Sequence, residues 1–355
     1  MSARTGGESA DRENADRLAS MGGPGPSSDE RPPVDSRTHP TRSSSSEAIP
    51  GKVVAVVLTW NNYGDTAEAL EGLRASTRAA DEVLIVDNGS TDDTAARLRE
   101  RFPAYEVLTL PENRGFTLGS NRGLAEALDR GADFILFLAN DTVPAPDALA
   151  ELLRTAGGDE RAGIVGPRVM EYDAPSTLQH GAGYVDPTTG GVRIRDAEQT
   201  AECDWITGCA FLLRADALRA LPEPRGFDPR YHTYWEDVDF SVRLRRAGFR
   251  ALYEPRARVL HKESEARRAA MSPLRRLSRH FYTTRNRYLF ARRHLSSAQR
   301  LTQTAWLLGV DLPMHLWESI KRNRRLVPRE VSLIFGAHVD GLRGRTGPAR
   351  REGIY

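Results

Sequence analysis

Four apolar runs between residues 52 and 138 alternate with helical or loop-like segments. Apolar runs that end in small polar residues are typical of strands buried on both faces of a parallel sheet. They cover residues 52–59, 82–87, 105–110 and 133–138. Between them the spacing predicts helices at 66–75 and 94–101 and a loop at 113–121 that leads into a helix through Ala127. This alternation predicts an α/β fold with a mostly parallel central sheet.

The next part of the chain has a less regular pattern. It predicts a helix at 146–154, a strand at 163–169 and a strand that ends at His261 and contains the segments 251–253 and 258–260. Segments 179–183 and 186–195 have the composition of loops. We expect these loops to shape a binding pocket.

Residues 234–249 predict a helix with an acidic first turn. Glu236, Asp237 and Asp239 lie where a helix N-terminus favours negative charge, and Gly248 is a stop signal. An aromatic, turn-rich segment at 226–235 precedes this helix. A carboxylate near aromatic walls can have a raised pKa and act as a general base, but an acidic cluster also caps a helix. The local pattern leaves both interpretations open.

The two ends of the chain differ in character from the middle. Residues 1–50 are rich in Ser, Gly, Pro and charged residues, which predicts a disordered tail. Residues 266–355 predict a helical, basic C-terminal extension, and from Lys262 onward there are 20 Lys or Arg against 7 Asp or Glu. Within it, 301–320 is apolar with two tryptophans but is expected to break at Asp311 and Pro313.

Composition excludes several classes of protein. Hydrophobic residues make up 39% and charged residues 28%, as in globular enzymes. Two cysteines provide no disulfide framework, and neither a signal peptide nor a membrane span is expected. No dinucleotide fingerprint, P-loop or known nucleic-acid-binding motif occurs, so nucleic acid is not an expected partner.

Polar residues follow three of the predicted strands. They are Thr59 to Asn62, Asp87 to Ser90, and Asn140 with Asp141. In open parallel sheets, ligands bind at the carboxyl ends of the strands. The sequence therefore predicts a nucleotide site at this edge of the sheet.

Seven segments in this order resemble family-2 glycosyltransferases of the GT-A fold, and especially the bacterial branch that contains rhamnosyltransferases and galactofuranosyltransferases. The match runs from Lys52 to Ser264. The segments are 57–61, 86–92, 112–116 with Asn121, 138–142, 204–208 before 213–214, 235–237, and 255–261 with Ser264. The resemblance implies a GT-A domain at 51–265, with a nucleotide-sugar half at 51–145 and an acceptor half at 146–265.

The resemblance implies a role for each residue at the sheet edge. Asp87 would contact the base or ribose of a nucleotide-sugar donor, and the residues beside it would line the same pocket: Thr59, Asn61, Asn113 and Asn140. Asp141 would bind a divalent cation, Mg²⁺ or Mn²⁺, with His261 as a second ligand. Ala139 departs from the family pattern, which has an acidic or amide residue there.

The resemblance also implies a reaction. Asp237 would be the general base and Glu236 would position the acceptor or its loop, with Trp205, Gly208 and Trp235 binding substrate. The expected activity is inverting transfer of a sugar, such as L-rhamnose from dTDP-rhamnose, to a carbohydrate or lipid-linked acceptor. The alternatives are a sugar nucleotidyltransferase and a catalytically inactive carbohydrate-binding subunit.

The apolar stretch in the C-terminal extension has its own alternatives. Residues 301–325 fit peripheral association with an anionic membrane, but equally a helical lid or a dimer contact. We expect the protein in the cytoplasm, with the inner face of the plasma membrane as the site of any such association.

Overall fold

The computed structural model describes residues 51–349 except for 187, 224, 264–272 and 324–326. The predicted disordered tail, and Ser264, Arg324 and Arg325 of the sequence motifs, lie outside the described residues. The described residues, including those of the C-terminal helices, belong to one compact unit.

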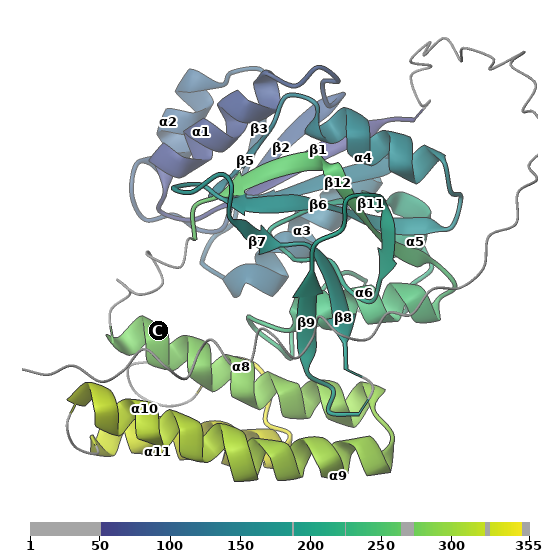
Figure 1. Ribbon diagram of the computed structural model, residues 1–355. Coiled ribbons are helices and arrows are strands. Elements are labelled where there is room, and N and C mark those ends of the chain that lie inside the picture. Colours follow the sequence, from purple (N-terminus) through teal and green to yellow (C-terminus); the bar gives the residue numbers. More distant parts are fainter. Residues whose placement is uncertain (1–50, 187, 224, 264–272, 324–326, 350–355) are drawn as a thin grey trace, which may run out of the picture. The chain divides into compact units, whose positions relative to one another are not determined.

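The first half of the sheet has the predicted parallel strands. Four strands alternate with three helices. They are β1 (Val53–Thr59), α1 (Tyr63–Arg74), β2 (Glu82–Asp87), α2 (Thr94–Arg101), β3 (Glu106–Thr109), α3 (Gly115–Asp129) and β4 (Phe134–Ala139). β1 pairs in parallel with both β2 and β4, and β2 pairs in parallel with β3. The strand-helix alternation of the sequence is thus confirmed (Figure 1).

The second half extends the same sheet. It comprises β5 (Thr142–Pro144), α4 (Ala148–Gly157), β6 (Ala162–Glu171), β7 (Leu178–His180), β8 (Ala182–Val185), β9 (Val192–Arg195), β10 (Ala201–Cys203), β11 (Ala210–Arg214), α5 (Ala215–Arg219), α6 (Glu236–Arg246) and β12 (Arg250–His261). The main strand order is β10-β12-β6-β11-β4-β1-β2-β3. β11 is antiparallel to both neighbours, so β6 and β12 run in the same direction as β1 to β4.

The alternating side chains of the central strands build two cores. On β1, Val54 and Val56 pack with α3 and α6 on one face, whereas Val53 and Ala55 pack with α1 and α4 on the other. Successive residues of a strand point to opposite faces, which explains why a continuous apolar run is needed here. The result is a sheet between two helical layers (Figure 1).

Two local predictions were wrong. The predicted loop at 113–121 is mostly helix, because α3 already begins at Gly115, where the Asn88 side chain accepts a hydrogen bond from the backbone N–H of Arg114 at 3.1 Å. The loop-like segment 179–195 contains β7, β8 and β9. The strand predicted to end at His261 is confirmed as β12, which has an irregularity between Glu254 and Arg258. The early start of α3 depends on Asn88, which is distant in sequence, whereas β8 and β9 pair with each other as a hairpin.

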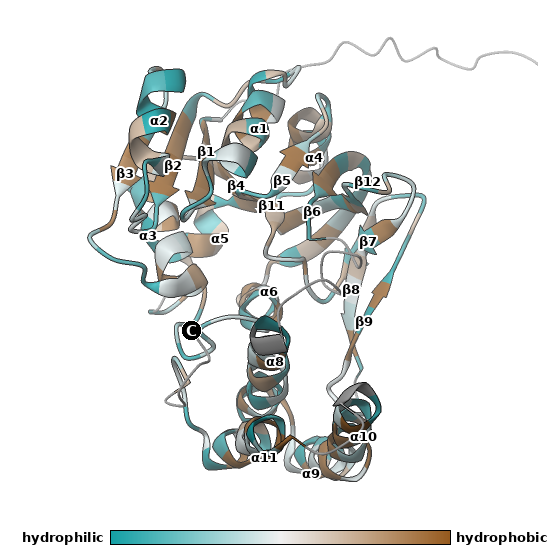
Figure 2. Cartoon of the chain, turned by 90° about the vertical axis from the view of Figure 1, so that its left-hand side faces the viewer, coloured by the Kyte–Doolittle hydropathy of each residue, from teal (hydrophilic) through white to brown (hydrophobic). Residues whose placement is uncertain are grey.

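The predicted helical extension is confirmed. It consists of α8 (Pro273–His294), α9 (Ser297–Trp306), a π-helical turn (Leu307–Asp311), α10 (Leu312–Asn323) and α11 (Pro328–Arg343). The break expected at Asp311 and Pro313 is instead the π-helical turn, which keeps the chain helical. A wider turn accommodates a proline ring that would otherwise collide with the preceding turn. α8 lies nearest to the sheet domain and below α6 (Figure 2).

Among the helices of the described ranges, none combines the length and apolar composition needed to cross a membrane.

Candidate active site

The polar strand ends meet at one edge of the sheet, as predicted. Thr59 pairs in register with Asp87, and its neighbour Leu58 pairs with Ala139. Thr59 is buried, and its hydroxyl lies 2.7 Å from that of Thr66 at the start of α1. The amide of Asn140 donates to the same Thr66 hydroxyl at 3.3 Å. Two of the residues predicted to line a nucleotide pocket, Thr59 and Asn140, are therefore joined through the Thr66 hydroxyl.

Asp87 combines a structural contact with an unused acceptor. Its Oδ1 accepts a hydrogen bond from the backbone N–H of Ser90 at 3.0 Å, which closes the turn at the end of β2. Its Oδ2 is buried and has no hydrogen-bond partner within the described part of the chain. A buried carboxylate oxygen without a donor is costly, so it favours a ligand that brings one, such as a base N–H or a ribose hydroxyl.

Asn61 and Asn113 shape the loops around this edge. Asn61 has a left-handed backbone (φ 47°) and accepts a hydrogen bond from the N–H of Thr91 at 2.8 Å. The side chain of Asn113 accepts one from the N–H of Gly115 at 2.8 Å. Gly89 has φ 73°, and a Cβ there would lie 2.3 Å from the carbonyl carbon of Glu112. The two loops approach too closely for any side chain at Gly89.

Asp141 and His261 form the candidate metal site. β5 and β12 are antiparallel and pair Thr142 with His261, which brings the Asp141 carboxylate to 3.3 Å from His261 Nε2. His261 is buried, whereas Asp141 is partly exposed. In the described ranges, no cluster of three or more His, Cys, Asp or Glu side chains is arranged to hold a metal ion. Among the described residues, Asp141 and His261 are therefore a pair without a third His, Cys, Asp or Glu ligand.

Gln179 fixes the tautomer of His261. The Gln179 amide nitrogen donates to the backbone carbonyl of Glu263, so its Oε1 must face His261 Nδ1, 2.5 Å away. Nδ1 is then the protonated nitrogen, and Nε2 presents a lone pair to the Asp141 carboxylate. With a neutral His261, two acceptors face each other at 3.3 Å, and either a proton on Nε2 or a metal ion beside them would remove this conflict. The donor set fits a divalent cation whose other ligands come from phosphate oxygens and water.

Asp237 and Glu236 occupy the first turn of α6 but differ in surroundings. Asp237 is partly exposed and accepts hydrogen bonds from the backbone N–H groups of Gly208, at 3.0 Å, and Val238, at 2.9 Å. Glu236 is buried, and its Oε2 has no partner within the residues described. Gly208 matters for this contact because a Cβ there would lie 3.3 Å from the Cβ of Asp237.

Both carboxyl groups have raised pKa values. Burial is the main cause of the raised pKa of Glu236, and the neighbouring Asp237 carboxylate raises it further. Burial also raises the pKa of Asp237, and the hydrogen bonds from Gly208 and Val238 oppose this rise. Asp237, with its oxygens held in place and partly exposed, is the better placed of the two to take a proton from a ligand.

Asp239, the third acidic residue of this turn, has a structural role. It is fully buried and accepts hydrogen bonds from Arg243 at 2.7 Å and from Tyr231 at 3.2 Å. His294 Nε2 lies 2.7 Å from its Oδ1. Burial alone would raise the pKa of Asp239, but the hydrogen bond with His294 and the positive charges of Arg243, His294 and Arg293 lower it. The acidic first turn therefore contains one buried ion-pair residue and two carboxyl groups with raised pKa values.

The segment before α6 is strained. His232, Tyr234 and Trp235 have φ values of 68°, 63° and 71°, in the left-handed region that residues other than glycine avoid. Each such residue costs about 1–3 kcal/mol, and such strain clusters at functional sites. The chain therefore reaches Glu236 through a conformation that its surroundings must impose.

The two tryptophans predicted to bind substrate belong to one apolar cluster. Trp205 and Trp235 are each 6% exposed and pack with Tyr231, Val238 and Phe290. The Trp205 ring covers Gly183, where a Cβ would lie 2.4 Å from it. Its indole nitrogen is buried without a partner among the described residues.

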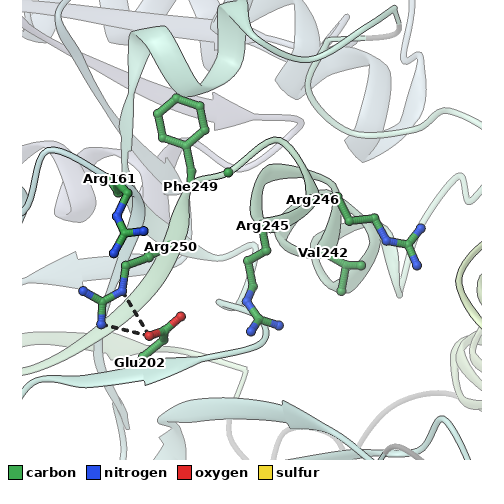
Figure 3. Close-up of a pocket in the computed structure, with 8 residues that line it drawn as sticks. Arg161, Glu202, Val242, Arg245, Arg246, Phe249 and Arg250 are labelled. Carbon is green, nitrogen blue, oxygen red and sulfur yellow. Dashed lines mark hydrogen bonds and ion pairs between the residues drawn. The ribbon is translucent and has the colours of Figure 1, made fainter.

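A surface cavity of about 670 Å³ lies elsewhere (Figure 3). Arg245 and Arg246 line it from the last turn of α6, about 15 Å along the helix from the carboxylates of the first turn. Its Arg250 is already paired with Glu202 at 2.8 Å. This cavity is thus separate from the predicted site.

Sequence reasoning missed two contributors to the site. Gln179 lies in a segment that looked like a loop, and only the pairing of β7 with β6 brings it to His261. Asn286 of α8 contacts the strained segment before α6. Only the packing of α8 against residues 231–235 brings it there.

Comparison with known proteins identifies the family. A family model described as "Glycosyl transferase family 2" matches residues 54–221. The chain is 30% identical over 313 residues to N-acetylglucosaminyl-diphospho-decaprenol L-rhamnosyltransferase of Mycobacterium tuberculosis, covering 80% of this chain and 98% of that protein. It is 31% identical over 303 residues to galactofuranosyltransferase GlfT1 of the same organism, covering 78% and 96%. The chain belongs to glycosyl transferase family 2 and is a glycosyltransferase.

Solved structures confirm the GT-A fold. S. aureus TarS 1–349 in complex with UDP-GlcNAc superposes with a TM-score of 0.56 at 16% identity, covering 82% of this chain and 81% of that one. GalNAc-T7 with UDP, GalNAc and Mn²⁺ gives a TM-score of 0.54 at 13% identity, covering 76% and 58%. At these identities the likeness concerns the fold alone.

Proposed function

We propose that this glycosyltransferase is inverting and metal-dependent, and that it transfers L-rhamnose from dTDP-rhamnose to a lipid-linked or carbohydrate acceptor. The observation that carries the proposal is the arrangement of Asp141 and His261, whose acceptor atoms face each other at 3.3 Å beside the nucleotide edge of the sheet. The relative with 30% identity, which is named as an L-rhamnosyltransferase on a decaprenol-linked substrate, supports the choice of sugar and acceptor.

Asp237 acts as the general base in this proposal. It accepts the proton of the acceptor hydroxyl while the hydroxyl oxygen bonds to the anomeric carbon and the bond to the donor diphosphate breaks. Single displacement inverts the anomeric configuration and forms no covalent enzyme intermediate. Glu236, with its pKa raised by burial, stays protonated over a wider pH range and helps to position the acceptor.

The donor is held at the opposite side of the site. Asp87 Oδ2 accepts a hydrogen bond from the base or ribose, and Asp141 with His261 Nε2 binds Mg²⁺ or Mn²⁺. When bound, such a cation offsets the charge that develops on the leaving diphosphate. Asn140, held by Thr66, replaces the contact that Ala139 cannot make.

The decisive experiment is a panel of nucleotide sugars with and without Mn²⁺. We expect dTDP-rhamnose to give turnover with a decaprenyl-diphosphate-linked acceptor, an inverted product and no activity in excess EDTA. Turnover with another donor would overturn the rhamnose assignment alone. Full activity in EDTA would overturn the metal assignment, and a retained anomeric configuration would overturn the role of Asp237.

We also propose that the C-terminal helices bind the surface of an anionic membrane, in the cytoplasm at the inner face of the plasma membrane. Leu301 is 73% and Trp317 is 60% exposed, and they are accompanied on α9 to α11 by other exposed apolar side chains, namely Leu308, Val310, Met314, Phe335, Val339 and Leu342. Exposed basic residues lie on the same helices, at Arg300, Lys321, Arg329 and Arg343. Apolar anchors with neighbouring positive charge suit an anionic lipid surface, where a lipid-linked acceptor would reside.

Vesicle sedimentation tests this surface. The protein should pellet with anionic vesicles at low salt and be released by high salt, and Trp317→Ser should weaken binding. Ile194→Ser is the matched control, because Ile194 is an exposed apolar residue of β9 in the catalytic domain. If the protein remains in the supernatant and elutes as a dimer, the exposed apolar residues form a dimer contact and the membrane proposal is wrong.

A further inference from the structure

One face of α8 lies against the strained segment that leads to the catalytic carboxylates. Tyr282, Arg285, Asn286 and Phe290 are spaced three, one and four residues apart, so they form one stripe on this helix. All four contact residues 231–235, which immediately precede Glu236. The opposite side of α8 packs on α11 and includes Tyr288, whose hydroxyl lies 2.9 Å from His338 Nδ1.

Asn286 binds the backbone of this segment directly. Its amide nitrogen donates to the carbonyl oxygens of Tyr231, Thr233 and Tyr234, at 3.0, 2.7 and 2.7 Å. Asn286 is fully buried, so water cannot replace these bonds without opening the interface. Since an amide nitrogen has only two hydrogens, two of the three carbonyls share one of them, and all three carbonyls of the turn point to the same nitrogen.

Arg285 sets the orientation of Asn286. Its Nε and Nη2 donate to Asn286 Oδ1 at 3.0 and 2.9 Å, so the amide nitrogen is turned toward the carbonyls. Its Nη2 also donates to the carbonyl of Tyr231 at 2.8 Å, and its Nη1 to that of Gly347. Arg285 is 1% exposed, and in the described part of the chain its polar contacts go to carbonyls and Asn286 rather than to a carboxylate.

Two aromatic contacts complete the attachment. The His232 ring lies 5.1 Å from the Tyr282 ring, and the Trp235 ring lies 5.2 Å from the Phe290 ring, measured between centroids. His232 and Trp235 are two of the three residues in this segment that have left-handed backbones. The side chains of α8 therefore hold both the carbonyls and the rings of the strained segment.

We propose that α8 is part of the active centre and that Asn286 is a positioning residue for Asp237 and Glu236. This rests on the proposed role of Asp237. The strained segment enters α6 at Trp235, so its relaxation would rotate the first turn of α6 and move Asp237 from the Gly208 N–H. The C-terminal extension would thus control turnover through the geometry of the base, without contacting substrate.

The test is Asn286→Asp, which keeps the shape but has no N–H to donate. We expect kcat to fall about 10²-fold while the KM for the donor stays within about twofold, since a misplaced base affects the chemical step. Tyr288→Phe is the matched control on the other side of α8: it removes a buried hydrogen bond and should lower the melting temperature while leaving kcat unchanged. Equal falls of kcat in both variants would overturn the proposal.

A second variant keeps the test valid if Asn286→Asp does not fold. Phe290→Leu keeps an apolar filler but removes the ring against Trp235, and it should lower kcat with little change in donor KM. An unchanged kcat in the folded Phe290→Leu protein would overturn the proposal. Asp237→Asn, assayed in parallel, separates the role of Asp237 as the base from the positioning role of α8. Normal turnover of Asp237→Asn would refute the proposed base. The positioning role is tested by the kcat of the α8 variants relative to that of Tyr288→Phe.

Discussion

Asp237→Asn is the most informative single substitution in the proposed mechanism. The asparagine keeps the size of the side chain but cannot accept the proton of an acceptor hydroxyl. Loss of a general base costs about 10²- to 10⁴-fold in rate, or about 3–5 kcal/mol in the activation free energy. We therefore expect kcat to fall by this factor while donor binding is retained, because the nucleotide edge lies on other strands.

The structure also predicts the effect of this substitution on stability. The two oxygens of Asp237 accept from two backbone N–H groups, of Gly208 and Val238. Asparagine has one acceptor oxygen, so one N–H loses its partner, at a cost of about 1 kcal/mol for this partly exposed site. In a domain of this size that corresponds to a fall in Tm of roughly 2–4 °C. Removal of a carboxylate whose pKa is raised by burial offsets part of it.

The assay follows turnover, donor binding and Tm for the same preparations. Asp81→Asn serves as control, because Asp81 also accepts a backbone hydrogen bond, from Val53 at 2.7 Å, at the opposite edge of the sheet. It should lower Tm and leave kcat unchanged. Near-normal turnover of Asp237→Asn together with an inactive Glu236→Gln would mean that the two roles are reversed. If both variants stay active, the acidic turn serves only as a helix cap.

Three further predictions concern other parts of the chain. Burial raises the pKa of Glu236 above its ordinary value of 4.5, so the folded protein loses stability as the pH rises from that value through the raised pKa. Glu236→Gln should therefore gain in Tm over the wild type as the pH rises above 4.5, and a pH-independent difference would contradict this. Asp141→Asn should remove the Mn²⁺ dependence of stabilisation by dTDP, measured by thermal shift, because it removes one of the two ligands; unchanged Mn²⁺ dependence would place the ion elsewhere. Removal of residues 1–49 should leave Tm and turnover intact, since that segment lacks a core-forming pattern; an insoluble or inactive product would show that the tail contributes to the fold.

The sequence alone determined the α/β architecture and the edge at which the site would lie. The apolar runs of β1, β2 and β4 can only be buried on both faces, and a parallel arrangement then places Thr59, Asp87 and Asp141 at the same edge. The order of the polar motifs was enough to indicate a GT-A glycosyltransferase. These properties depend on local periodicity and on segments close in sequence, which a single chain displays.

Tertiary structure decided how the individual groups are used. Asp239 and Asp237 lie two residues apart on one helix. The buried Asp239 contacts Arg243, Tyr231 and His294 and is part of an ion pair, whereas Asp237 accepts a hydrogen bond from the Gly208 N–H and stays partly exposed. The same holds for His261, whose tautomer depends on Gln179, 82 residues away. In the left-handed turn before Glu236, three backbone carbonyls bind the amide nitrogen of Asn286, which is 52 to 55 residues away in sequence. Hydrogen-bond partners distant in sequence determine charge and geometry at this site, and periodicity contains no information about them.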